Sequence, residues 1–189
     1  MKGQDIIILL KLVSLHDRER ECPQGTVQGK SAEEEDPFSM RGLGAALGIS
    51  KTEVSASIRR SLESGLAIKG ASQVKPNRQR LLEFILHGLR YVFPAKPGAV
   101  TRGVPTGFSA PMLKGQVLAP GNYGYVWPSA HGEVRGESIP PLFKSAAEAV
   151  ESDPRLYEYL ALVDAIRIGR QRETNLAGER LRERLMNRG

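Results

Sequence analysis

The sequence predicts a mainly α-helical fold with a small β component, and two patterns support this prediction. Apolar residues recur every three or four positions in several separate segments, which is the period of an amphipathic helix. Glycine and proline are concentrated between residues 105 and 141, where irregular structure and short strands are expected instead. With 189 residues, 40% of them hydrophobic, the chain is long enough for one domain with an extension.

The elements follow in chain order. Helices are expected at residues 5–15, 39–47, 50–64 and 77–89, and a strand or helix end at 66–68. A polar, acidic segment predicts a mobile loop at about 17–37. Short strands are expected at 91–93 and 100–104, and one hairpin around residues 130–132. Asp153-Pro154 has the sequence of an N-cap followed by a first-turn proline, so we expect a long helix from there to about Asn187.

Positive charge is concentrated in the middle of the chain. The formal net charge is +6, and residues 37–93 alone carry 9 basic and 3 acidic side chains. Residues 94–130 carry 3 basic and no acidic side chains, residues 1–36 carry 5 and 8, and residues 131–189 carry 10 of each. A basic surface attracts phosphates by Coulomb attraction and counterion release. The charge therefore favours nucleic-acid binding, although a solvated Lys/Arg surface has the same composition.

Residues 39–66 contain the most informative pattern, two short helices separated by a tight turn. Ser39 can cap the first helix, and Gly48 allows a left-handed backbone at the turn. Ser50 and Glu53 have the spacing of a capping box, which begins the second helix. This order of signals predicts a helix-turn-helix.

The two helices divide into an inner and an outer face. Apolar residues one turn apart form the inner faces: Leu43 and Leu47 on the first helix, and Val54, Ile58 and Leu62 on the second. Gly44 permits close approach of the second helix, and Ile49 fills the angle between them. Small, polar or cationic residues remain outside, as a helix in the DNA major groove requires: Lys51, Thr52, Ser55, Ala56, Arg59 and Arg60.

These residues resemble the helix-turn-helix of winged-helix transcription regulators, MarR-type proteins in particular, over roughly residues 39–66. The resemblance is carried by Gly48-Ile49-Ser50-Lys51-Thr52-Glu53-Val54-Ser55 and Ile58-Arg59-Arg60-Ser61-Leu62-Glu63-Ser64-Gly65-Leu66. It implies a winged helix-turn-helix core whose second helix enters the major groove of double-stranded DNA. It places Lys51, Thr52, Ser55 and Ala56 at base- or backbone-contacting positions and Arg59 at a phosphate-facing one, and the family often has Arg where Ala56 stands.

Two segments are candidates for the wing. A displaced hairpin at residues 91–105, with a type II turn at Lys96-Pro97-Gly98-Ala99, would bring Arg90, Lys96 and Arg102 to phosphate. The alternative is residues 68–77, with Lys69, Lys75 and Arg78. If the displaced hairpin is the wing, the candidate DNA-binding residues are Ser39, Arg41, Ser50, Lys51, Thr52, Ser55, Ala56, Arg59, Arg60, Lys96 and Arg102.

Catalysis and metal binding have little support in the sequence. The histidines at positions 16, 87 and 131 have no metal-ligand spacing, and no nucleophile, P-loop or dinucleotide motif is present, so we expect no enzyme, metal or cofactor. The single cysteine, Cys22, excludes an intramolecular disulfide. No apolar run approaches the length of a membrane span, so a cytoplasmic protein is expected.

The sequence therefore leaves two functions open. The first is a sequence-specific, double-stranded DNA-binding transcriptional regulator that acts as a homodimer. The second is a protein-interaction or antitoxin-like subunit whose winged-helix core is a scaffold for a co-encoded protein partner. In both, residues 1–105 are the winged helix-turn-helix domain, which binds DNA in the first function and is the scaffold in the second. Residues 106–189 are a Gly/Pro-rich segment and a long helix for dimer or partner contact.

Overall fold

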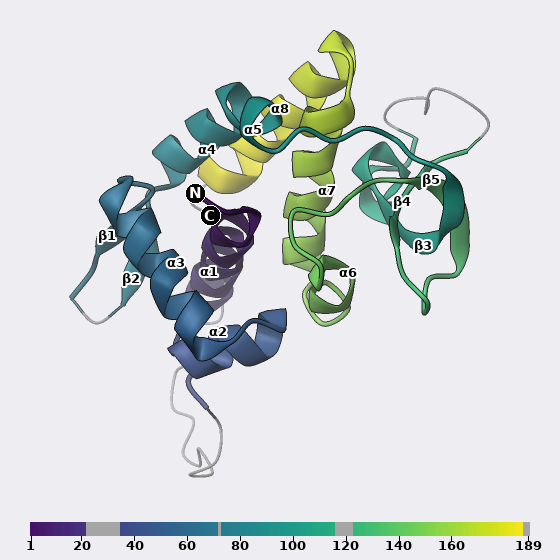
Figure 1. Cartoon of the computed structure of the whole chain (residues 1–189). Helices are drawn as coiled ribbons and strands as arrows, with labels where there is room; N and C mark the ends of the chain where they lie inside the picture. The colour runs from purple at the N-terminus through teal and green to yellow at the C-terminus, as the bar shows by residue number, and fades with distance from the viewer. Residues whose placement is uncertain (22–34, 72, 116–122, 187–189) are drawn as a thin grey trace. The chain divides into compact units, whose positions relative to one another are not determined.

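The computed structural model describes residues 1–21, 35–71, 73–115 and 123–186, and the chain divides into two compact units (Figure 1). The first unit runs from Met1 to Arg78 and the second from Gln79 to Arg188. The boundary thus falls at the start of a helix, whereas the sequence favours one near residue 105. The described elements are mainly helices with small sheets, which confirms the predicted fold class at this level.

The first unit contains three helices followed by a hairpin. They are α1 (Gly3–Glu21), α2 (Met40–Leu47), α3 (Lys51–Glu63), β1 (Ala67–Lys69) and β2 (Val74–Pro76). Helix α1 packs on α2, α3 and β2, and Figure 1 shows α3 crossing α1 beside the hairpin. The strands are antiparallel, with Ile68 opposite Lys75 and Lys69 opposite Val74.

The predicted loop at 17–37 is wrong at its beginning, because residues 17–21 continue helix α1. Contacts with strand β2 and with Arg78, just beyond it, explain the longer helix. Asp17 forms an ion pair with Arg78, and the His16 ring nitrogen lies 3.4 Å from the Val74 carbonyl oxygen. Residues 22–34, including Cys22, lie outside the described residues.

Local signals at the turn between α2 and α3 behave as the sequence predicts. Ser39 Oγ accepts the Gly42 N–H at 2.9 Å, and Ser50 Oγ accepts the Glu53 N–H at 3.3 Å. Gly48 ends α2 with a φ of 64°, which favours glycine. The sequence predicts that Gly44 lets the second helix approach, but the backbone that lies against it belongs to the turn. A Cβ on Gly44 would lie 2.5 Å from the Ile49 carbonyl oxygen.

The second unit combines a small barrel with helices. Its elements are α4 (Arg78–His87), α5 (Leu89–Val92), β3 (Val100–Thr106), the 3-10 turns η1 (Gly107–Ser109) and η2 (Pro111–Leu113), β4 (Tyr125–Pro128), β5 (Val134–Ser138), α6 (Ala146–Ala149), α7 (Pro154–Ile168) and α8 (Gln171–Met186). Strand β3 pairs antiparallel with both β4 and β5, and β4 pairs parallel with β5, which closes a three-stranded barrel.

Three sequence predictions are wrong in this unit. Tyr91 and Val92 belong to helix α5 rather than to a strand. The expected hairpin around residues 130–132 does not form, because β4 and β5 pair parallel. The long C-terminal helix is interrupted: Gly169 is extended, with a ψ of 152°, and the Glu173 carboxylate accepts the Arg170 N–H at 2.6 Å, which begins a second helix. The expected N-cap at Asp153, in contrast, is present.

A buried ionic cluster joins α7 to the barrel. Asp164 and Arg167 are only 2% and 3% exposed, and Arg167 Nη1 donates to Asp164 Oδ1 at 2.6 Å. The other carboxylate oxygen accepts hydrogen bonds from Thr106 Oγ1 at 2.8 Å and Trp127 Nε1 at 2.5 Å. Burial raises the pKa of Asp164, and the cation and these donors oppose that shift. The cluster therefore supplies partners for the polar groups that the core of this unit encloses.

Arg167 also donates hydrogen bonds to two backbone carbonyl oxygens. Nε donates to the Phe93 carbonyl at 3.0 Å, and Nη1 also donates to the Pro140 carbonyl at 3.1 Å. One guanidinium thus connects α7 to the segments before the barrel and after it. Trp127, which is 1% exposed, is part of this core and is not available to stack on a base.

Candidate nucleic-acid interface

Helix α3 separates a packed face from an exposed one. Val54, Ser57, Ile58 and Ser61 are buried, and these positions lie one or two turns apart along the inner face. The opposite face carries the predicted groove residues: Lys51, Thr52, Ser55 and Arg59 are exposed and Ala56 is half-buried. These five residues line an open depression on the surface. Of the predicted DNA-binding residues, these five therefore lie together on one exposed face of α3.

The two ends of this face are cationic. Among the residues that the structure describes, Lys51 has no ion pair, and Arg59 has one weak partner, Glu63, with the Arg59 Nε and Glu63 Oε1 atoms 4.0 Å apart. The Arg59 side chain is 75% exposed, and such surface pairs stabilise by at most about 1 kcal/mol. Both cations are therefore free to exchange water for an external anion at little cost.

Three other predicted residues lie at helix starts. Ser39 and Ser50 use their hydroxyl oxygens to cap α2 and α3, so a hydroxyl hydrogen is what each can still donate to a ligand. Arg41 is exposed in the first turn of α2. In the sequence, Ser39 and Arg41 lie at the start of the helix before α3, and Ser50 directly precedes α3.

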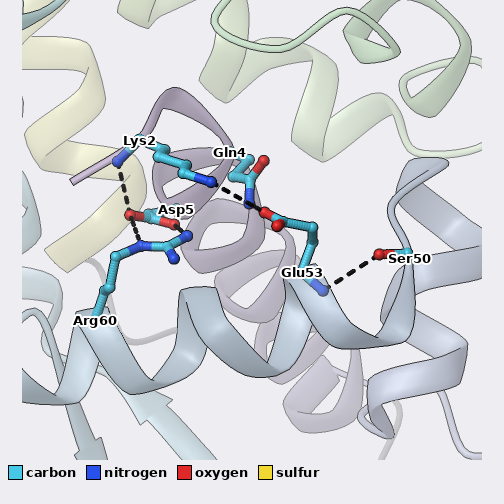
Figure 2. Close-up of polar contacts among 6 residues, drawn as sticks. All are labelled: Lys2, Gln4, Asp5, Ser50, Glu53 and Arg60. Carbon is cyan, nitrogen blue, oxygen red and sulfur yellow. Dashed lines mark hydrogen bonds and ion pairs between the residues drawn. The ribbon is translucent and has the colours of Figure 1, made fainter.

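Arg60 has a partner inside the protein. Its Nε donates to Asp5 Oδ2 at 3.0 Å and its Nη2 donates to Asp5 Oδ1 at 2.6 Å, which is a two-pronged ion pair (Figure 2). Asp5 is fully buried and the Arg60 side chain is 25% exposed. Arg60 thus joins α3 to α1 and is separated from the exposed set that ends at Arg59.

Glu53 also departs from its predicted role. In a capping box its carboxylate would return to the Ser50 N–H. Instead it binds the Gln4 side-chain amide and lies 3.4 Å from Lys2 Nζ (Figure 2). These two contacts hold the pKa of Glu53 below its ordinary value. Half of the predicted capping box is therefore present, and the other half is replaced by a contact to α1.

The carboxyl of Asp5 makes the first unit sensitive to acid. Burial raises its pKa, but hydrogen bonds from Arg60 and from the Lys2 N–H outweigh burial and hold the pKa below its ordinary value. A carboxyl whose pKa is lower in the folded state than in the unfolded chain stabilises the fold at pH values above its unfolded pKa of about 3.9. This stabilisation is lost as the pH falls through the folded-state pKa.

We therefore expect Asp5→Asn to flatten the decrease in stability below about pH 4, because the variant has no carboxyl to protonate there. Thermal unfolding followed by circular dichroism, from about pH 6 to about pH 2, measures this dependence. Glu35→Gln, which removes an exposed carboxyl, is the matched control and should keep the wild-type profile. An unchanged profile for Asp5→Asn would contradict the expectation.

The predicted displaced wing is wrong as a structure. Residues 91–92 are helical, and β3 pairs with β4 and β5 rather than with a strand at 91–93. Lys96 is exposed in the segment before β3, and Arg102 is exposed on β3 directly opposite Arg135. Both predicted wing residues thus belong to the second unit and not to the unit that contains α3.

The alternative segment, residues 68–77, does form a hairpin directly after α3. Lys69 and Lys75 are exposed, and neither has an ion pair among the described parts of the chain. The register places them on opposite sides of the two-stranded ribbon, since Lys75 faces Ile68 and Lys69 faces Val74. Arg78, by contrast, is paired with Asp17.

The contacts between α1 and α3 were not expected from the sequence. Lys2 directly precedes α1, and Gln4 and Asp5 lie in its first turn, ahead of a mostly apolar run at residues 6–13. Their partners Glu53 and Arg60 are seven residues apart, so they share one face of α3. A polar cluster at the start of an apolar helix, together with this spacing of opposite charges, is the signal that could have indicated the contact.

Comparison with known proteins yields no relative: no family model, no curated protein and no solved structure matches the chain. Among the described residues, no three His, Cys, Asp or Glu side chains lie together as a metal site would require. Within the same residues, no helix combines the length and the apolar character needed to span a membrane.

Proposed function

We propose that residues 1–78 are a winged helix-turn-helix domain and that the protein is a cytoplasmic, sequence-specific regulator that binds double-stranded DNA as a homodimer. The observation that carries this proposal is the exposed face of α3, where short side chains lie between two cations while the inner face is packed. The hairpin β1–β2 follows α3 directly, in the position that a wing takes beside the recognition helix.

The dimensions of this face suit a major groove. Lys51 and Arg59 are eight residues apart, which is about 12 Å along a helix and about the width of the major groove. Their side chains can therefore reach the phosphates that border the groove. Between them, Thr52, Ser55 and Ala56 are short enough to let the helix approach base edges, where a hydroxyl bonds base atoms and a methyl group contacts thymine.

A homodimer would place two copies of α3 in successive major grooves, about 34 Å apart along the DNA. Selection of bound duplexes from a randomised pool, followed by sequencing, tests the proposal. We expect enrichment of a site with two related halves separated by about one helical turn. Failure to enrich any sequence would overturn the proposed function.

Arg59→Gln tests the face itself. We expect weaker binding to the selected duplex and a salt dependence shallower by about one unit in the slope of log K against log salt, because one phosphate contact is lost. Arg182→Gln, which removes an exposed arginine from α8, is the matched control and should leave the slope unchanged. Equal slopes for Arg59→Gln and wild type would contradict the placement of α3 in the groove.

The alternative function, a subunit that holds a protein partner, is favoured by a different observation. Tyr91 and Val92 on α5 are 79% and 49% exposed, which is unusual for neighbouring apolar side chains. Co-purification of a stoichiometric partner at high salt, lost in Tyr91→Ser, would support this function. The two functions are compatible, as in an antitoxin that also represses its own promoter.

A further inference from the structure

The start of α1 holds α3 at two points that are two helical turns apart. At one point Lys2 and Gln4 contact the carboxylate of Glu53, and at the other Asp5 binds Arg60 (Figure 2). Contacts seven residues apart on one helix face resist both tilting and rotation of that helix. The orientation of α3 is therefore set by the first turn of α1 as well as by the apolar inner face.

The carboxylate of Asp5 is itself fixed. Oδ2 accepts the Lys2 backbone N–H at 2.8 Å in addition to Arg60 Nε, and Oδ1 accepts Arg60 Nη2. The side chain is fully buried, so it has no water to exchange with. Asp5 therefore presents an immobile acceptor pair whose geometry matches a guanidinium.

Arg60 lies at the border of the exposed face. It follows Ala56 by four residues and Arg59 by one, so its Cα lies beside the face that would enter the groove. A guanidinium released at this position could reach a DNA phosphate without reading any base. The ion pair with Asp5 keeps it on the protein.

We propose that Asp5 is a positioning and specificity-determining residue for DNA recognition by α3. It fixes the orientation of the helix through Arg60, and it withholds this cation from the phosphate backbone, where the cation would strengthen binding to every sequence equally. The inference rests on the proposed function. It predicts that loss of Asp5 reduces discrimination between sequences more than it reduces total affinity.

The test compares two duplexes of equal length and composition, one selected by the wild-type protein and one scrambled, over a salt series. For Asp5→Asn we expect roughly tenfold lower discrimination between them, tighter binding of the scrambled duplex, and a salt slope for that duplex steeper by about one unit. Glu158→Gln breaks a similar pairing with Arg180 and Arg184 in the second unit and should change none of these values.

Arg60→Gln is the second variant and decides the question if Asp5→Asn does not fold. The proposal predicts a wild-type salt slope, because Arg60 does not touch phosphate, whereas Arg59→Gln lowers the slope. A slope reduced to that of Arg59→Gln would overturn the inference. So would an Asp5→Asn protein that loses affinity equally for both duplexes at an unchanged slope, which is the result of a purely structural role. A wild-type protein that retains no duplex would overturn the proposed function, and this inference with it.

Discussion

Replacing Asp164 with alanine is expected to lower the free energy of unfolding of the second unit by about 3–5 kcal/mol. The change leaves the Arg167 guanidinium, which is 3% exposed, without its carboxylate. It also leaves the Thr106 hydroxyl and the Trp127 N–H without their acceptor. Each such buried group costs about 1–3 kcal/mol when its partner is removed.

Fluorescence of Trp127 during urea unfolding measures this effect directly. Trp127 is the single tryptophan of the chain and donates to Asp164, so its emission reports on the unit in which the cluster lies. The control is Asp164→Ala combined with Arg167→Met, which removes both charges together. We expect the double variant to recover part of the loss, because an uncompensated charge costs more than the absence of the pair.

Two results would contradict this account. A loss below about 1 kcal/mol for Asp164→Ala would mean that the pair is no more important than an exposed one. A double variant whose loss equals the sum of the two single losses would mean that Asp164 and Arg167 do not act on each other.

Reversing the two charges of the hairpin, with Lys69→Glu and Lys75→Glu, is expected to weaken binding to the selected duplex by about 100-fold or more near physiological salt. Each substitution removes a candidate phosphate contact and adds a charge that the phosphates repel. Both lysines are exposed and have no ion pair among the described residues, so the fold should remain intact. Fluorescence anisotropy with a labelled duplex measures the affinity, and circular dichroism checks the fold.

The chain offers a control with the same change of charge. Lys96→Glu with Arg102→Glu alters two exposed cations of the second unit, where the sequence suggested a displaced wing. We expect binding to the selected duplex to change by less than about threefold, the residual effect of net charge at physiological ionic strength. The reverse ranking of the two variants would assign phosphate binding to the second unit and refute the hairpin as a wing.

The features predicted well from the sequence are those with local causes. Ser39, Gly48 and Ser50 act on N–H groups or dihedral angles within a few residues of themselves, so their sequence signals are sufficient. The exposed face of α3 follows in the same way, because a buried stripe with helical spacing defines the opposite side.

The features that could not be predicted depend on residues distant in the sequence. Arg60 looks like a groove residue until Asp5, 55 positions earlier, is placed beside it. The barrel depends on β3, which ends at Thr106, pairing with strands that begin at Tyr125 and Val134, and neither pair is joined by a tight turn. An apolar stripe ends before Gly169 and a thinner one resumes at Leu176, Leu181 and Leu185, so the sequence predicts one long helix if the two stripes are joined, whereas the structure has two helices.

The closure of the barrel has a consequence for how copies of the chain can associate. Strand β3 pairs with β5 from Val100 to Gly103 and with β4 from Gly103 to Thr106, and β4 and β5 pair with each other where the sheet closes. Among the described residues, each of the three strands therefore has a neighbour on both sides, and the stretches of β3 left without a partner on one side are at most three residues long. Such short stretches offer little backbone onto which a strand of a second molecule could add. We therefore expect self-association through this unit to depend on side-chain packing, which single substitutions on its surface can weaken without opening the sheet.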